Sequence, residues 1–199
     1  MVFPEFVLGG AQPRSRYVKP DGKLPGEEWT PERPVDAGDL KAVSYLPVLF
    51  SSKLSRPALL QSDIEFHDEF NKDFVSVGFG SNAKTRGVFD NDGNRVTKDS
   101  SLIEVDVAHS RIKSLRGKEF LHEPGFDYAV ILKIHPEQYK DRIWIVCAGE
   151  RGEGTPPAGW FLANKWQELH KRAKGRPFAA VLKAKVGQDQ STLLVDMVL

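Results

Sequence analysis

Cysteine is almost absent from this chain of 199 residues, which contains Cys147 alone. An intrachain disulfide and a zinc site with several cysteine ligands are therefore excluded. Cys147 lies within an apolar run, where we expect a buried, inert thiol, because reactive cysteines need exposure and a positive neighbourhood. The five histidines form no His-x-x-x-His pair, so we predict no metal site and assign no cofactor.

Long hydrophobic runs and an excess of one charge are also missing. No apolar stretch approaches the roughly 20 residues that a membrane-spanning helix needs. The first ten residues do not read as a signal peptide, because they lack a basic start and Pro4 and Glu5 interrupt their apolar run. With 28 basic and 27 acidic side chains, the net charge of +1 gives no general attraction for a polyanion. We therefore expect a cytoplasmic protein whose partners are neither membranes nor nucleic acids.

Length and composition fit one domain with an N-terminal arm. Residues 1–37 are rich in proline and glycine and show no sustained hydrophobic period, so they are predicted to form an irregular arm. Residues 38–199 are predicted to form an α/β domain. The arm contains Phe6, Tyr17 and Trp29, which make it the candidate contact for a protein partner or for a second copy of the chain.

Hydrophobic periodicity predicts a mixture of helices and strands in the α/β domain. Asp39 is the expected cap of a helix that continues to Phe50. Strands are expected at 58–61, 74–77, 102–107, 126–134, 142–148, 178–186 and 192–199, and helices at 62–70, 83–89 and 156–174. The strands expected at 126–134 and 142–148 are predicted to form one hairpin, and those at 178–186 and 192–199 another. This order predicts a single Rossmann-like three-layer domain with a mixed sheet and helices on its faces.

Two glycine-bearing turns follow apolar strand candidates, one at residues 78–85 and one at 149–155. Glycine lets a ligand approach the backbone, and free N–H groups at a helix start attract anions, so both turns suit a phosphate or a ribose. The expected ligand-binding residues are Gly78, Gly80, Ser81, Asn82, Lys84, Thr85, Gly149, Arg151, Gly154 and Thr155. Each turn also fits an ordinary turn without a ligand. Neither has the third glycine of the dinucleotide fingerprint or the Gly-Lys-Ser/Thr ending of a P-loop.

The turns and the strands before them resemble a small family of Rossmann-like modules found in bacterial signalling or defence proteins and in archaeal surface-layer proteins. That family's pattern is a strand ending in Gly-Gly-Pro or a variant, followed by Ser-Asn and a threonine, then an Asp-Tyr-Gly strand, then Ala-Gly with a downstream Gly-Thr. The matching residues are Gly78, Gly80, Ser81, Asn82, Thr85, Asp127, Tyr128, Ala148, Gly149, Gly154, Thr155 and Ala158. The match covers about residues 73–170, with Phe79 and Ala129 as departures. The resemblance implies the fold and the positions of ligand loops, and it implies no particular chemistry.

Four carboxylates are weak candidates for catalysis, namely Glu104, Asp106, Glu150 and Glu153. Glu104 and Asp106 share one face of a strand, and paired carboxylates can cleave a glycosidic bond. Solvent-facing side chains on a half-buried strand explain the same pattern. His109, Asp106 and Ser110 are also close in sequence, an arrangement that occurs often by chance.

Three functional hypotheses follow from these residues. The leading one is a ligand-recognising module for a nucleotide-like or phosphorylated small molecule, in signalling or defence. The second is a hydrolase that cleaves an N-glycosidic bond of NAD or a nucleoside. The third is a non-catalytic structural or complex-forming subunit that uses the N-terminal arm as its contact.

Overall fold

The computed structural model describes residues 2–3, 36–50, 59–63, 69–79, 82–89, 102–106 and 110–199. The main sheet has the strand order β10-β9-β7-β8-β3-β1-β2, and a second sheet has the order β4-β5-β6. The main strands are β1 (Val2–Phe3), β2 (Gln61–Ser62), β3 (Phe74–Val77), β7 (Phe126–Ile134), β8 (Trp144–Gly149), β9 (Phe178–Lys185) and β10 (Gln188–Val198). The remaining elements are β4 (Ile103–Asp106), β5 (Arg111–Ser114), β6 (Glu119–Leu121), α1 (Ala37–Leu49), α2 (Ala83–Val88), α3 (Thr155–Ala173) and a 3-10 turn, η3 (Glu137–Tyr139). The chain therefore has an α/β fold, as expected.

The main sheet is mixed, and its parallel part positions the two glycine-bearing turns. β3 pairs with β8 in parallel, with Phe74 opposite Trp144 and Val77 opposite Cys147. The N–H of Gly78 continues this ladder by donating to the Cys147 carbonyl at 2.9 Å. β7 is antiparallel to both β8 and β9. Because parallel strands end at the same edge of a sheet, the turns after β3 and β8 leave the sheet as neighbours.

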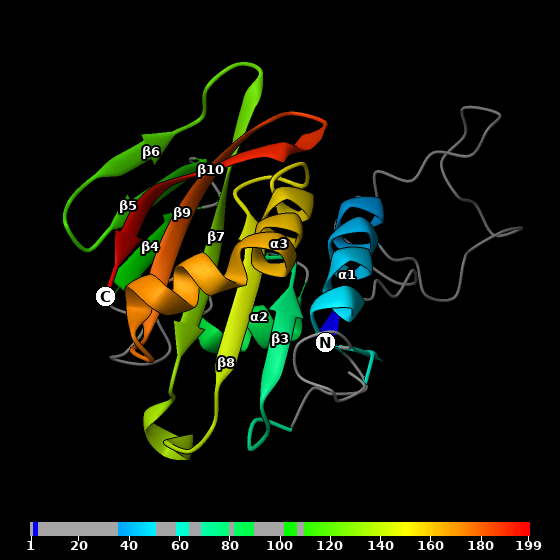
Figure 1. The fold of residues 1–199 in the computed structure, drawn as a ribbon, viewed down its shortest axis with the longest axis vertical. Helices are drawn as coiled ribbons and strands as arrows, with labels where there is room; N and C mark the ends of the chain where they lie inside the picture. The colour runs from blue at the N-terminus through cyan, green and yellow to red at the C-terminus, as the bar shows by residue number, and fades with distance from the viewer. Residues whose placement is uncertain are drawn as a thin grey trace, which may run out of the picture.

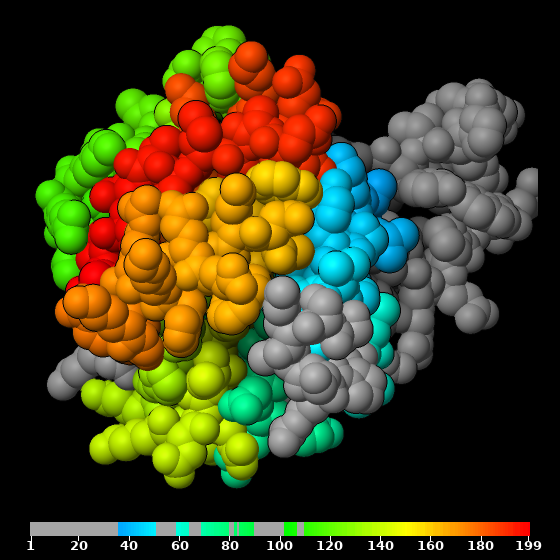
Figure 2. All heavy atoms as spheres, viewed as in Figure 1, coloured from blue at the N-terminus to red at the C-terminus, as the bar shows by residue number. Residues whose placement is uncertain are grey.

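Helices α1 and α3 cover one face of the main sheet, as Figure 1 shows. Figure 2 shows the two helices against each other on the surface of this face. The broad apolar side of α3 explains its position, because Phe161 and Leu162 are buried in one cluster with Ile131 and Cys147 of the sheet. Pro156 and Pro157 are tolerated at the start of α3, because N–H groups in the first turn of a helix have no hydrogen-bond acceptor within the helix.

The opposite face of the main sheet packs against α2 and the three-stranded sheet. Phe89, Ile112 and Phe120 are buried in one cluster with Val130 and Val146 of β7 and β8. The strand at 102–107 was expected from its alternation, and β4 is indeed half-buried in that pattern. Strands β5 and β6 were not expected, because each has three or four residues and charged side chains on its outer face.

Helix α1 begins three residues earlier than the sequence indicated. Asp36, not Asp39, is its cap, and the Asp36 carboxylate accepts hydrogen bonds from the N–H groups of Gly38 at 2.8 Å and Asp39 at 3.2 Å. Asp39 is instead a buried residue within the first helical turn of α1. Both residues suit a cap chemically, so composition alone did not separate them.

Other boundaries differ in smaller ways from the expected ones. Val2–Phe3 pairs with β3 and β2, so the start of the predicted arm is a strand of the main sheet, while residues 4–35 lie outside the described residues. The expected strand at 58–61 is instead β2 at Gln61–Ser62. The helix expected at 62–70 falls largely on residues outside the described part. No described helix combines the length and the apolar character needed to cross a membrane.

Candidate functional site

The first turn, after β3, is held by hydrogen bonds among its own polar residues. Gly78 has φ +89°, a left-handed conformation that favours glycine. The Asn82 side chain is buried, accepts from the N–H groups of Lys84 and Thr85, and donates to the Val77 carbonyl at 2.7 Å. The Thr85 hydroxyl donates to the Gly78 carbonyl at 2.7 Å and lies 2.8 Å from the Ser76 hydroxyl. Asn82 and Thr85 thus shape the turn.

Lys84 does not supply the positive charge that the sequence suggested for this turn. Its side chain is fully buried, and its ammonium group lies 3.7 Å from the centre of the Phe70 ring and 5.7 Å from that of Phe74. Phe74 is the first residue of β3, at the end of the strand away from Gly78. Gly80 and Ser81 lie outside the described residues.

The second turn, after β8, is closed by backbone packing. The Gly149 N–H donates to the Thr155 hydroxyl at 3.1 Å, and the Gly154 N–H donates to the Arg151 carbonyl at 3.1 Å. A Cβ atom on Gly149 would lie 2.5 Å from the Thr155 nitrogen and 2.6 Å from the Gly154 carbonyl carbon. The backbone therefore requires glycine at Gly149, and this requirement explains the residue without a ligand.

The helix starts at this edge offer few N–H groups to an anion. Asp36 caps α1 and Asn82 caps α2. In α3, Pro156 and Pro157 have no N–H, and the Ala158 N–H donates to the Gly154 carbonyl at 3.2 Å. An anion at this edge would have to be bound chiefly by side chains.

Among the predicted ligand-binding residues that the structure describes, Arg151 has a charged side chain exposed to solvent. Its side chain is 47% exposed, and its Nε and Nη2 atoms each donate to the Ser110 hydroxyl at 3.4 Å. Its Nε atom also lies 3.8 Å from Oε1 of Glu150. Ser110, in the turn between β4 and β5, has φ +48°. Ser110 and Glu150 thus hold one side of the guanidinium group of Arg151, and the rest reaches solvent.

Two buried carboxyl groups lie at the second turn: Glu150 is within it, and Asp127 is beside it. Asp127 accepts a hydrogen bond from the Tyr128 N–H at 2.8 Å, and its Oδ2 atom makes no hydrogen bond with a described residue. Burial and the charges of Glu150 and Glu153 raise the pKa of Asp127 to about 6, against the Tyr128 hydrogen bond and Arg151, which lower it. Burial also raises the pKa of Glu150, while Ser110 and Arg151 lower it in part.

Asp127 and Glu150 approach the turn from opposite faces of the main sheet. The Asp127 side chain lies beside Gly154 at the start of α3. The Glu150 N–H donates to the Tyr128 carbonyl, and the Glu150 carboxylate lies 3.8 Å from the Nε atom of Arg151, which contacts Ser110 in the turn before β5. Glu150 lies opposite Tyr128, and adjacent residues of a strand point to opposite faces, so the Asp127 carboxyl group lies on the other face of the sheet from the side of Tyr128 and Glu150.

Asp39 joins α1 to both turns. A Cβ atom on Gly78 would lie 2.8 Å from either carboxylate oxygen of Asp39, which shows how closely the two residues approach. Burial, Asp36 and Asp63 raise the pKa of Asp39 to about 7, and a hydrogen bond with the Thr155 side chain opposes this rise. Figure 1 shows the starts of α1 and α3 side by side at this edge.

The other candidate catalytic carboxylates either lie beside a basic side chain of the second sheet or are exposed to solvent. Asp106 pairs with Arg111 at 3.2 Å, and Glu104 lies opposite Lys113 in the ladder between β4 and β5. Glu153 is exposed in the second turn. Burial raises the pKa of the Cys147 thiol, as expected for an inert cysteine. Among the described residues, no group of three or more His, Cys, Asp or Glu side chains is placed to hold a metal ion.

Comparison of the chain with protein-family models, with curated proteins and with solved structures finds no match. The sequence pattern does not indicate Asp39 or Ser110 as residues of this edge, because Asp39 fits a helix cap and Ser110 is near only His109 and Asp106 in sequence. A carboxylate near the start of an apolar strand is the available signal for Asp127. The contact of Ser110 with Arg151 joins positions 41 residues apart, so local sequence gives no sign of it.

Proposed function

We propose that this protein is a Rossmann-like module that binds a nucleotide-like or otherwise phosphorylated small molecule at the edge where β3 and β8 end. One observation carries the proposal: Arg151 projects from the turn after a parallel strand, held by Ser110 at 3.4 Å and still 47% exposed. Ligands of open α/β sheets bind outside the carboxyl ends of parallel strands. A planar guanidinium group held in one orientation suits a phosphate.

In this proposal, the two turns have different tasks. Gly149 and Thr155 close the second turn, and Arg151 contacts the anionic group of the ligand. Asn82 and Thr85 give the first turn its shape, so they support the ligand-binding edge without contacting the ligand. The proposed setting is a signalling or defence protein of the cytoplasm, as the resemblance of the two turns suggests.

A thermal-shift experiment with a nucleotide panel tests the proposal. Purified protein is heated with NAD and with adenine, guanine and uracil nucleotides at increasing concentrations. Binding at 100 times the dissociation constant stabilises a protein by about 2.7 kcal/mol, which raises the melting temperature of a chain of this size by about 5–10 °C. We expect such a shift for at least one nucleotide.

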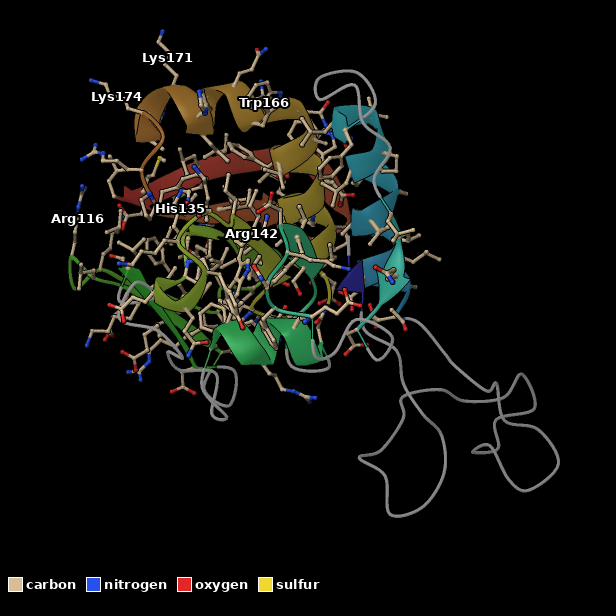
Figure 3. The ribbon with its side chains drawn as sticks, turned by 90° about the horizontal axis from the view of Figure 1, so that it is seen from below. Arg116, His135, Arg142, Trp166, Lys171 and Lys174 are labelled. Carbon is tan, nitrogen blue, oxygen red and sulfur yellow. The ribbon has the colours of Figure 1, made fainter. Side chains whose placement is uncertain are left out.

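Two arginine variants make that experiment specific. Arg151→Gln should lose the shift, and Arg116→Gln should keep it. Arg116 is an exposed arginine whose side chain projects from the side of the molecule away from α1, as Figure 3 shows. No shift with any nucleotide, or an equal shift in both variants, would overturn the proposal.

Hydrolysis of an N-glycosidic bond is a second candidate function, and Asp127 favours it. Burial raises the pKa of Asp127 to about 6, which suits a group that exchanges a proton near neutral pH. Release of nicotinamide from NAD, or of a free base from a nucleoside, would support this function if Asp127→Asn abolished it. Binding without product release would leave the module non-catalytic. The structural-subunit hypothesis depends on residues of the arm outside the described part.

A further inference from the structure

The charges around Arg151 constrain the ligand that the proposed site accepts. The turn that carries Arg151 also carries Glu150 and Glu153, and Asp127 lies beside it. Glu150 and Glu153 both act electrostatically on Asp127, as Arg151 does with the opposite sign. The turn therefore has one guanidinium group and three carboxyl groups in or beside it: Glu150 at 3.8 Å from Arg151, Glu153 two residues further along the chain, and Asp127 beside Gly154.

Burial makes these charges act strongly on a ligand. The Glu150 side chain has no exposed surface, and the Asp127 residue is 3% exposed, so water screens neither charge well. Asp36 and Asn82 each accept hydrogen bonds from two N–H groups at the starts of α1 and α2, and the two prolines at the start of α3 have no N–H group, so the backbone offers little compensating positive potential. Arg151 is the one cationic side chain of this turn, so each further negative charge on a ligand adds repulsion from the ionised carboxylates.

From this arrangement, and resting on the proposed function, we infer that the site selects a nucleotide whose phosphate carries a single negative charge, a phosphodiester, over a phosphate monoester. A phosphate monoester carries about −1.5 to −2 charges at neutral pH because its second pKa is about 6. A phosphodiester lacks the second ionisable oxygen and keeps one charge. Cyclic mononucleotides and nucleotide monoalkyl esters belong to this class.

Esterified and free phosphates on one nucleoside give the direct test. The probes are adenosine 5′-monophosphate, its methyl ester and adenosine 3′,5′-cyclic monophosphate, with the matching guanosine and uridine compounds. Titration calorimetry at pH 8 keeps the monoesters doubly charged and Asp127 ionised. We expect at least one of the two diester forms to bind about tenfold more tightly than the monoester of the same nucleoside.

A surface glutamate allows the charge argument to be tested without disturbing the core. Glu153→Gln removes one exposed carboxylate near Arg151 and should narrow the preference for diesters about threefold. Glu137→Gln is the matched control, since Glu137 is also exposed but lies in η3, between the end of β7 and the start of β8, at the opposite end of these strands. It should leave the preference unchanged.

The outcomes separate this inference from the proposed function. If monoesters bind as tightly as diesters or more tightly, and binding still requires Arg151, the inference is overturned while the proposed function stands. If Glu153→Gln and Glu137→Gln change the preference equally, charge at this turn does not set it and the inference also fails. If no probe binds, both fail together.

Discussion

The two glycine-bearing turns look equivalent in the sequence but differ in what they leave exposed. In the described part of the first turn, Asn82, Lys84 and Thr85 are buried, and Asn82 and Thr85 hold the backbone. In the second turn, Gly149 and Thr155 hold the backbone, while Arg151 and Glu153 are exposed. A polar residue beside a glycine can therefore maintain a turn or serve a ligand, and only the pattern of hydrogen bonds distinguishes the two.

Substitution of Gly149 in the second turn should lower the free energy of unfolding more than any other substitution proposed below. Gly149→Ala places a methyl group 2.5 Å from the Thr155 nitrogen, so the backbone must move. We expect the free energy of unfolding in urea to fall by about 3 kcal/mol. Gly152→Ala is the control within the same turn, because a Cβ there meets nothing within 4 Å. Equal stability of the two variants would show that the turn is not closed as described.

Asp39 links the two turns, and its ionisation should make stability depend on pH. Its pKa is raised from 3.8 to about 7 in the folded protein, so its contribution to stability is fully present below about pH 4, falls as the pH rises above 4 and is lost once the pH has risen through 7. Between pH 4 and pH 6, the wild type should lose about 2–3 kcal/mol more than Asp39→Asn.

Urea unfolding of both proteins across this range measures the difference due to Asp39. Asp127 and Glu150, whose pKa values are also raised, remain in both proteins, so their contributions largely cancel. Parallel curves for Asp39→Asn and the wild type would mean that Asp39 titrates normally.

Removing the Asn82 side chain should weaken the first turn by a smaller amount. Asn82→Ala deletes the helix cap and leaves the buried Val77 carbonyl without its donor, which should cost about 2 kcal/mol. Asn164→Ala serves as control, because the Asn164 amide donates to the Trp160 carbonyl at an exposed position on α3. A loss of nucleotide affinity in Asn82→Ala with unchanged stability would assign Asn82 to the ligand instead.

Arg151→Gln should have the smallest effect on stability, below about 0.5 kcal/mol. Its partners are one serine hydroxyl at 3.4 Å and one carboxylate at 3.8 Å, and exposed ion pairs contribute little. Thermal unfolding without ligand measures this effect. A large destabilisation would show that Arg151, like Asn82, serves mainly to hold its turn.

The sequence predicted the elements with long, regular apolar patterns. The expected strand 126–134 coincides with β7, and the expected helix 156–174 differs from α3 by one residue at each end. Strands β5 and β6 were not predicted, because each contributes a single buried apolar residue, Ile112 or Phe120, and so shows no alternating apolar pattern. Their stability comes from packing on the main sheet, which local sequence does not encode.

The candidate site was predictable only in outline. Two apolar runs that each end in glycine indicated neighbouring strands, and β3 and β8 are indeed adjacent. The roles of individual residues depended on contacts from distant parts of the chain. Ser110 and Arg151 are in contact although they are 41 residues apart in sequence, and Asp39 lies close to Gly78 because α1 packs against this edge of the sheet. The local sequence pattern therefore indicates which edge of the sheet carries the two turns, but it does not indicate the role of each residue at that edge.

A titration followed by nuclear magnetic resonance tests most directly whether the second turn recognises the anion. The backbone amides and the Nε–H group of Arg151 are observed while the methyl ester of adenosine 5′-monophosphate is added. The account expects the Arg151 Nε–H signal and the amides of residues 149–155 to shift together and to saturate. Saturating shifts confined to residues 78–85, with the Arg151 signal unmoved, would contradict it.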